Sequence, residues 1–435
     1  MDPHLVMIAV PIMAVTYILV MIDRFDRSIL ALLGAGAMIL AGVLTQDQAI
    51  EGIDFNTIGL LTGMMVLVAV SRRSGVFEYL AISAAQAVRA SPIGLLASLA
   101  VVTAMLSALL DNVTTVLLIA PVTIAITRRL GVAPFPFLLA EVMASNFGGT
   151  ATLIGDPPNI LIGSAAGLTF NDFLVHLLPV VAVVMAVQVA VVHFVWGRGL
   201  VTTAVARDEI MALRPASSIT DARLLGHSIV VFALVLAGFT TSRMTGLQPG
   251  SIALIGAALL MLLENLARPR EEQFLAVSAT YGEVDWITIF FFVGLFIVVQ
   301  GVESSGALNW LAQEVTRLTH GNLMLTVFVV LWVSAIASAI IDNIPFVAAM
   351  IPVIHAMAPD FGGEQAILPL WLALSLGACF GGNGTLIGAS ANLTVSGIAQ
   401  REGIAFGFAA YTSRALPLTV LSVLIAQLYL YLRYL

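Results

Sequence analysis

The sequence contains no lysine, a single cysteine and little charge of either sign. A Walker A motif and a Schiff-base enzyme both require lysine, so its absence excludes both mechanisms. The lone Cys379 excludes an internal disulfide and a cysteine-based metal cluster. Only 10% of the residues are charged, whereas a soluble domain has about 25%. The net charge of −7 gives no sign of a nucleic-acid partner.

Apolar residues make up 60% of the chain and form long runs, such as residues 5–22, 29–44 and 173–196. Runs of this length are typical of membrane-spanning helices. The sequence therefore predicts a polytopic protein of the lipid bilayer. Without a nucleotide-binding motif, uphill transport would need an ion gradient or a partner ATPase, and both stay open.

The sequence is also internally repeated. The stretch "SALLDNVTTVLLIAPV" from Ser107 returns as "SAIIDNIPFVAAMIPV" from Ser338, at an offset of 231 residues. A stretch from Ile53 repeats at the same offset, and "FGGTATLIGDPPN" from Phe147 returns as "FGGNGTLIGASAN" from Phe380. Three blocks in the same order indicate a duplicated unit.

Arginine positions predict how the two copies are oriented. The positive-inside rule places Arg24, Arg72 and the linker around residues 198–223 in the cytoplasm, although Arg243 and Arg317 then fall outside. The span near residues 56–71 then runs inward, whereas its copy near 285–302 runs outward. We therefore expect an all-α polytopic membrane protein with two inverted repeats, about ten spans, two re-entrant hairpins and two broken helices. A bacterial or archaeal inner (plasma) membrane is the expected location.

This reading divides the chain into five parts: residues 1–52 (two scaffold spans), 53–196 (repeat 1, with hairpin 91–128 and broken helix 134–168), 197–226 (cytoplasmic linker), 227–284 (scaffold spans of the second half) and 285–435 (repeat 2, with hairpin 321–358 and broken helix 366–400). Residues 91–128 could form two full spans or a hairpin, and the shortness of the second arm favours the hairpin. Gly148-Gly149 and Pro157-Pro158 would interrupt a helix inside the membrane.

These motifs resemble the ion-transporter superfamily of arsenite permeases, D-type sodium/proton antiporters and the melanosomal P protein, and most closely its P-protein branch. The resemblance rests on "DNVTTVLLIAPVTI", "AEVMASNFGGTATLIGDPPN", "SAIIDNIPFVAAMIP" and "GACFGGNGTLIGASAN". It implies secondary transport, commonly by a homodimer with an elevator-type domain, in which the Asp-Asn stretches are hairpin tips that meet the broken helices. Related dicarboxylate carriers have Ser-Asn-Thr at the first tip, where this chain has Asp111-Asn112-Val113.

Acids and amides at the tips and breaks are the candidate binding residues. A carboxylate inside a membrane is costly and therefore usually functional, and oxygen-rich ligand sets suit hard cations such as Na⁺. Asp111 and Asp342 could instead simply cap the helices that follow them. Glu141 and Asp156 have no acidic twin, and Glu141 is a candidate for a proton path. The candidate ion-binding residues are Asp111, Asn112, Thr114, Thr115, Gly148, Gly149, Thr152, Asp156, Asn159, Asp342, Asn343, Gly381, Gly382, Asn383, Thr385 and Asn392.

The sequence thus predicts a secondary active transporter, not an enzyme, with H⁺ or Na⁺ as coupling ion and no other cofactor. Its expected cargo is a small inorganic ion or oxyanion, with arsenite efflux or Na⁺/H⁺ exchange favoured. A chloride-like anion conductance and a dicarboxylate carrier are the alternatives. An intramembrane aspartyl protease is a remote one, because such enzymes need a carboxylate dyad that shares a proton.

Overall fold

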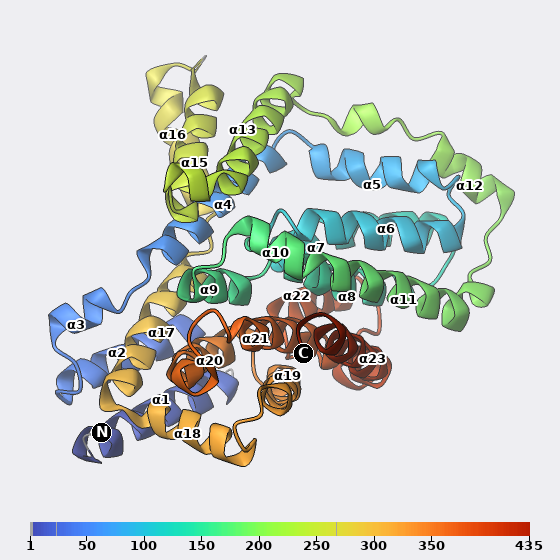
Figure 1. The fold of residues 1–435 in the computed structure, drawn as a ribbon. Helices are drawn as coiled ribbons and strands as arrows, with labels where there is room; N and C mark the ends of the chain where they lie inside the picture. Colours follow the sequence, from blue (N-terminus) through green and yellow to red (C-terminus); the bar gives the residue numbers. More distant parts are fainter. Residues whose placement is uncertain (1–2, 23, 267) are drawn as a thin grey trace.

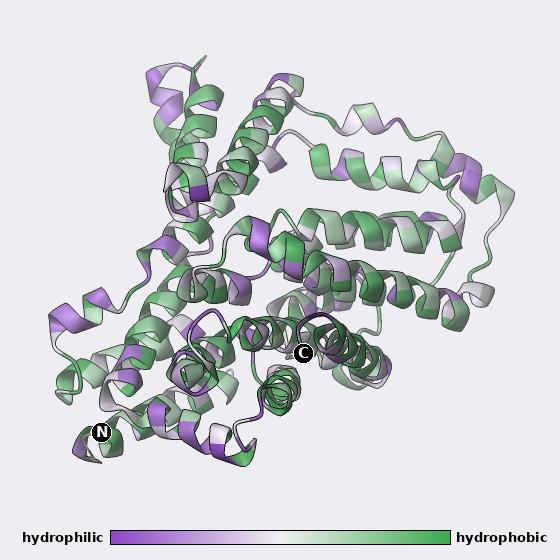
Figure 2. Ribbon diagram, viewed as in Figure 1, coloured by the Kyte–Doolittle hydropathy of each residue, from purple (hydrophilic) through white to green (hydrophobic). Residues whose placement is uncertain are grey.

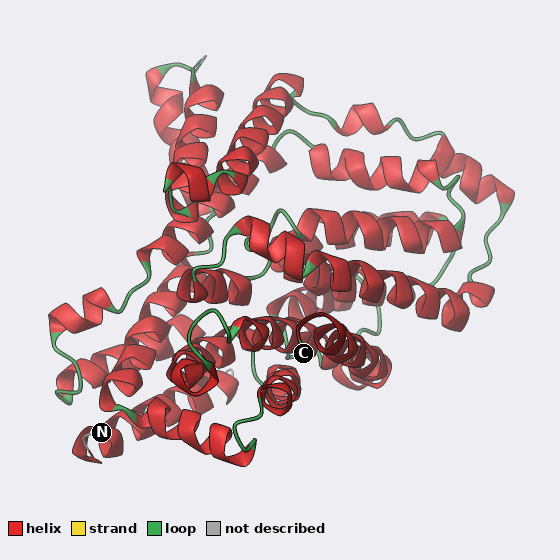
Figure 3. Ribbon diagram, viewed as in Figure 1, coloured by secondary structure: helices red, strands yellow, loops and turns green. Residues whose placement is uncertain are grey.

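The computed structural model describes residues 3–22, 24–266 and 268–435, and within these ranges the chain consists of helices and connecting turns, without strands. Eight described helices are long and apolar enough to cross a membrane, and three shorter apolar helices add to them. Hydrophobic residues cover most helices, while polar ones gather toward helix ends and connections (Figure 2). Short loops join the helices (Figure 3). The predicted all-α polytopic fold is confirmed.

The helices of the first half follow the predicted order of spans, hairpin and broken helix. In chain order they are α1 (Pro3–Ile22), α2 (Arg27–Leu40), α3 (Gln46–Glu51), α4 (Phe55–Arg72), α5 (Val76–Ala87), α6 (Pro92–Ser107), α7 (Asn112–Arg129), α8 (Phe135–Thr150), α9 (Pro157–Ala166), α10 (Phe170–His176) and α11 (Leu178–Trp196).

The linker and the second half repeat this order. They contain α12 (Ala204–Met211), α13 (Ala222–Thr240), α14 (Ser242–Thr245), α15 (Pro249–Asn265), α16 (Arg270–Gly282), α17 (Trp286–Ser305), α18 (Ala307–Leu318), α19 (Leu323–Ile340), α20 (Asn343–Met357), α21 (Leu368–Gly381), α22 (Ser390–Arg401) and α23 (Phe408–Tyr434).

Both predicted breaks lie inside the molecule. Helix α8 ends at Thr150, and α9 begins at Pro157, whose ring suits the first turn of a helix because no backbone N–H is needed there. In the second half a short 3₁₀ turn, Gly382–Gly384, follows α21 before α22 begins at Ser390. The α6–α7 and α19–α20 pairs turn back beside these breaks, as re-entrant hairpins do.

The two halves interlock rather than lie side by side. Helix α15 of the second half packs on α4 of the first, and α2 packs on α17 in the same way. The hairpins also exchange partners, since α22 contacts α7 and α9 contacts α20. We call α1, α2, α4, α13, α15 and α17 the scaffold, and α6–α9 with α19–α22 the core. In Figure 1 the scaffold lies to the left and the core occupies the centre and right.

Glycines allow close contact where core helices cross. A Cβ on Gly148 would lie 2.2 Å from the carbonyl oxygen of Ala104, and one on Gly381 would lie 2.3 Å from that of Ala335. Each hairpin arm therefore packs directly on the backbone of the broken helix beside it. The matching positions in the two halves give both crossings the same geometry.

The two arginines on the predicted outer side are both paired. Arg243 Nη2 lies 2.9 Å from Asp172 Oδ2, and Arg317 Nη2 lies 2.5 Å from Glu314 Oε1. These two arginines remain exceptions to the positive-inside rule, which counts basic residues and not net charge.

Candidate functional site

Buried asparagines join the first hairpin tip to both broken helices. The Asn112 amide donates to Asn146 Oδ1 at 2.9 Å. The Asn146 amide donates in turn to Asn383 Oδ1 at 2.8 Å and to Asn392 Oδ1 at 3.1 Å. All four side chains are buried. The two repeats therefore meet in a continuous amide network at the centre of the core.

Paired hydroxyl groups fasten each hairpin to the broken helix of its own repeat. Ser107 Oγ donates to the Ser145 carbonyl and Ser338 Oγ to that of Ala378, both at 2.6 Å. Thr152 Oγ1 donates to the carbonyl of Ala108, and its twin Thr385 does the same to Ala339, both at 2.5 Å. The hydroxyl groups of Thr152 and Thr385 thus donate their protons to backbone carbonyls of the hairpins.

Two candidate asparagines satisfy backbone carbonyls that the breaks leave without helical partners. The Asn159 amide donates to the carbonyls of Thr150 and Thr152, both at 3.0 Å. The Asn392 amide donates to those of Gly382 and Thr385, both at 2.8 Å. These hydrogen bonds give both asparagines a structural part in shaping the breaks.

A cavity of about 460 Å³ lies between the core and the scaffold. Its lining brings together the N-terminal ends of several helices and is strongly charged. The acidic side chains in the lining are Asp111, Asp156, Asp285 and Glu283, and the basic ones are Arg27 and Arg72. Asn112, Thr114 and Asn343 also face the cavity. The lining therefore combines candidate residues from both hairpin tips and the first break.

Asp156 is the most deeply buried acid of this lining, with 1% of its surface exposed. Asn112 Nδ2 donates to its Oδ1 at 3.4 Å, and the side chains of Asn343 and Cys379 lie beside its carboxyl group. Its second oxygen, Oδ2, has no hydrogen-bond partner of ordinary geometry among the described residues. A buried carboxylate oxygen in this state is costly unless a proton or cation occupies it.

The two hairpin-tip aspartates have different surroundings. Asp111 Oδ1 accepts the backbone N–H of Thr114 at 2.8 Å, as an N-cap, and within the described ranges Asp111 forms no ion pair. Asp342 also caps its helix, through the N–H of Ile344. In addition, its Oδ2 lies 3.2 Å from Arg27 Nη1. The capping alternative thus holds for both tips, yet only the second tip is neutralised.

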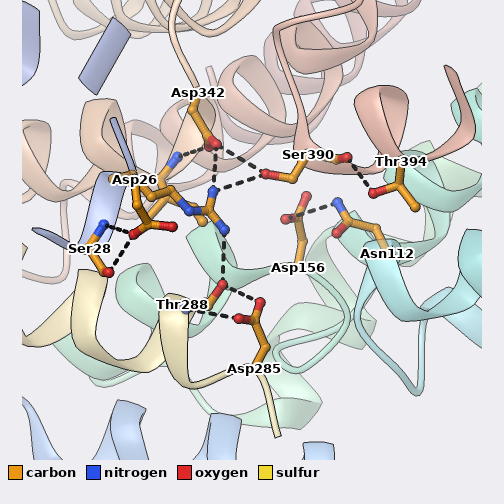
Figure 4. Close-up of polar contacts among 11 residues, drawn as sticks. Asp26, Ser28, Asn112, Asp156, Asp285, Thr288, Asp342, Ser390 and Thr394 are labelled. Carbon is orange, nitrogen blue, oxygen red and sulfur yellow. Dashed lines mark hydrogen bonds and ion pairs between the residues drawn. The ribbon is translucent and has the colours of Figure 1, made fainter. Parts of the chain in front are cut away.

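Arg27 connects the second tip to the scaffold. Its Nη1 also donates to Ser390 Oγ at 3.1 Å, and its Nη2 donates to Thr288 Oγ1 at 2.9 Å. Thr288 Oγ1 donates onward to Asp285 Oδ2 at 2.5 Å. In Figure 4 dashed lines run from an unlabelled guanidinium to Asp342, Ser390 and Thr288, and from Thr288 to Asp285, while Asp156 and Asn112 lie beside them.

The remaining candidates lie away from the cavity lining or take part in packing. Glu141 is buried and accepts a hydrogen bond from Thr123, and its Oε2 has no partner within the described part of the chain. Thr115 Oγ1 donates to the Asp111 carbonyl at 2.9 Å. Cβ atoms on Gly149 and Gly382 would approach the Gly155 and Gly388 carbonyls, to 2.5 and 2.9 Å.

Several residues of the site were not among the sequence candidates. Asn146 stands inside a motif quoted for the family resemblance, and its central position gives it the largest share of the amide network. Ser375 Oγ donates to Asn159 Oδ1 at 2.6 Å. Ser390 and Arg27 are far apart in the sequence and come into contact only in the folded chain. The one sequence signal that could have found Arg27 is its lack of a counterpart in the second half.

Two inverted repeats, two hairpin tips, two broken helices and a charged cavity between them define a polytopic membrane transporter. The family model described as "Citrate transporter" (CitMHS) matches residues 17–377. The chain belongs to this family. It is an integral protein of a bacterial plasma membrane, and its mycobacterial relatives agree with that location.

The curated relatives include uncharacterized transporters and proteins named P protein. An uncharacterized transporter of Mycobacterium tuberculosis is 44% identical over 98% of each chain. The P protein of Sus scrofa is 33% identical over 98% of this chain and 59% of its own length, and that of Homo sapiens is 32% identical with the same coverage. The resemblance to the P-protein branch is therefore confirmed.

A solved structure has a similar fold. The YdaH transporter of Alcanivorax borkumensis, described as having an unusual topology, superposes with a TM-score of 0.63. The match covers 88% of this chain and 86% of that one, at 16% sequence identity. At this identity the likeness concerns the fold alone, and it agrees with the inverted-repeat architecture derived above.

Proposed function

We propose that the chain is a secondary active transporter that couples the movement of a small ion to H⁺ or Na⁺, working by an elevator-type movement in a homodimer. The observation that carries this proposal is the pair of acids in the cavity. Asp111 and Asp156 face the same charged space, neither forms an ion pair within the described ranges, and one oxygen of Asp156 is free to accept a proton or cation. Carboxylate and amide oxygens are the ligands that Na⁺-sized hard cations prefer.

The acids favour Na⁺/H⁺ exchange as the transport reaction, with arsenite efflux as the other expected activity. A proton and a Na⁺ ion would compete for the same carboxylates, which is the simplest way to couple their opposite movements. Arsenous acid is neutral at physiological pH, so an acidic lining would not repel it. Both activities therefore suit an acidic cavity.

A carrier for a citrate-like carboxylate is the second candidate. Its support is the description of the family model and the presence of Arg27 and Arg72 in the cavity lining. Arginine binds carboxylates through paired hydrogen bonds. Against it stand the acids of the same lining, which would repel a free polyanion unless they were protonated or paired.

Currents from proteoliposomes on a solid-supported membrane would separate these functions. The purified full-length protein is challenged in turn with Na⁺, Li⁺, arsenite, chloride, succinate and citrate at two pH values. We expect Na⁺ and Li⁺ to evoke saturable currents that Asp156→Asn abolishes and that Asp47→Asn, a change at an exposed acid, leaves intact. Citrate-evoked currents without a cation response would favour the second candidate. Currents with Na⁺ and Li⁺ that Asp156→Asn does not alter would refute the first.

A further inference from the structure

Arg27 of the scaffold helix α2 has no basic counterpart in the other half. Gly63 and Gly294 are related by the 231-residue offset, and their Cβ positions meet the backbones of Ala253 and Ala31, respectively. Helices α2 and α15 are therefore images of each other, with Ala31 matched to Ala253. This alignment places Pro249 at the position of Arg27. The duplicated architecture accordingly has a guanidinium at only one of its two equivalent places.

The residues around the two hairpin tips also differ between the two halves. Asp342 binds Arg27, and Ser390 at the start of α22 donates a further hydrogen bond to it, at 3.2 Å. At the first tip the image of Ser390 is Pro157, which has no hydroxyl group, and the hydrogen bonds that Asp111 accepts come from the first turn of its own helix. The second tip is thus a filled cation site and the first an open one.

The guanidinium is held firmly on the scaffold side. Thr288 accepts a hydrogen bond from the guanidinium. The Cζ atom of Arg27 lies 5.3 Å from the ring centroid of Phe291, which is also on α17. The side chains of Arg27 and Asp342 are only 25% and 22% exposed. Partial burial and several partners make such a charge pair stronger than an exposed one. Arg27 therefore joins the scaffold to the tip of the second hairpin by a shielded contact.

We propose that Arg27 is a specificity-determining residue of this carrier: its guanidinium fills, as a tethered cation, the position beside Asp342 that corresponds to the exchangeable cation site beside Asp111. The proposal rests on the function proposed above. It follows that one cation per cycle exchanges with the bulk, at the Asp111–Asp156 side, although the duplicated fold offers two acidic tips. The same contact holds the second hairpin to the scaffold until Asp342 releases it.

The number of exchangeable cations tests this inference. In proteoliposomes that contain a pH-sensitive dye, the wild-type rate of Na⁺-driven proton movement should depend on Na⁺ with a Hill coefficient of about 1, whereas Arg27→Gln, which opens the second tip, should raise the coefficient toward 2. The double variant Arg27→Gln/Asp342→Asn removes the second acid as well and should return the coefficient to about 1. Arg24→Gln is the matched control, because Arg24 is an exposed arginine three residues away. An unchanged coefficient in Arg27→Gln would overturn the proposal.

Carbodiimide labelling gives a readout that does not depend on transport. The reagent must reach a carboxyl oxygen, and in the wild type the Arg27 guanidinium and Ser390 both contact Oδ2 of Asp342, so Arg27→Gln should expose this carboxyl group and increase its labelling several-fold. Mass spectrometry of the purified full-length protein locates the label, and Arg24→Gln should leave it at the wild-type level. Equal labelling of Asp342 in wild type and Arg27→Gln would contradict the inference.

Two further outcomes distinguish a failure of this inference from a failure of the proposed function. If the wild-type protein gives neither a cation-dependent current nor a cation-dependent proton movement, the proposed function fails, while the labelling of Asp342 still decides on Arg27. If Arg27→Gln alone does not fold, Asp342→Asn and the double variant carry the test. Whatever their maximal rates, both should keep the wild-type Hill coefficient for Na⁺, because Asp342 does not bind an exchangeable cation; a changed coefficient in both would overturn the inference.

Discussion

Replacing Gly381 with alanine should destabilise the core, because the broken helix α21 crosses the hairpin arm α19 at this residue. The added Cβ would lie 2.3 Å from the Ala335 carbonyl oxygen and 2.5 Å from its Cα, whereas ordinary contacts begin at 3.4 Å. The two helices would have to separate by about 1 Å, and overpacking of this kind costs about 1–3 kcal/mol. The helix propensity of alanine returns at most about 1 kcal/mol. We expect a net loss of about 1–2 kcal/mol.

Gly397 provides a matched control in the same broken helix. It lies in α22, and a Cβ there would meet no atom within 4 Å. Gly397→Ala should therefore leave the stability unchanged or raise it by about 0.5–1 kcal/mol. The midpoint of thermal unfolding of detergent-purified protein, followed by fluorescence-detected size exclusion, compares the two variants. A midpoint for Gly381→Ala at or above that of Gly397→Ala would refute the close crossing.

Three further results follow from buried contacts. Asn392→Ala should lower the free energy of unfolding by about 2 kcal/mol, because two carbonyls lose their donor, and the thermal midpoint measures this. Glu264→Ala should also lower the thermal midpoint, because Glu264 pairs with Arg73 at 3.2 Å and with Arg268 at 2.8 Å. The Glu264 side chain is buried, so 0.5 M salt should not abolish the difference in midpoint between wild type and variant. Cys379 should resist a maleimide in the folded protein and react fully after denaturation, as judged by intact mass.

The fold could be predicted from the sequence because local sequence patterns specify each part of the architecture. Apolar runs of membrane length, the Asp-Asn repeats at Asp111 and Asp342, and the glycine-rich interruptions each depend on neighbouring residues. A duplicated sequence then fixes the relation of the halves, because one repeat can be aligned with the other without a structure. In the structure the broken helices extend from Phe135 to Ala166 and from Leu368 to Arg401.

The chemistry of the site could be predicted only in part. The sequence pointed to Asp111, Asp156 and Asn343, which line one cavity, since each stands at a tip or a break. It could not indicate the partner of Asp342, because Arg27 is 315 residues away and belongs to a helix that crosses into the other half. Local patterns carry no information about such a contact.

The repeat comparison becomes most informative where the copies disagree. Asn146 and Asp156 of the first broken helix correspond to Cys379 and Ala389 of the second. The more polar residue of each pair belongs to the first half, whereas the guanidinium of Arg27 pairs with Asp342 of the second half. A perfectly symmetric carrier would offer the same site from both sides of the membrane, with no preferred ion at either tip. We propose that the unequal residues instead concentrate exchangeable charge at one tip and fixed charge at the other, so that the duplicated fold would supply the two-sided movement while the differences between its copies would select the ion.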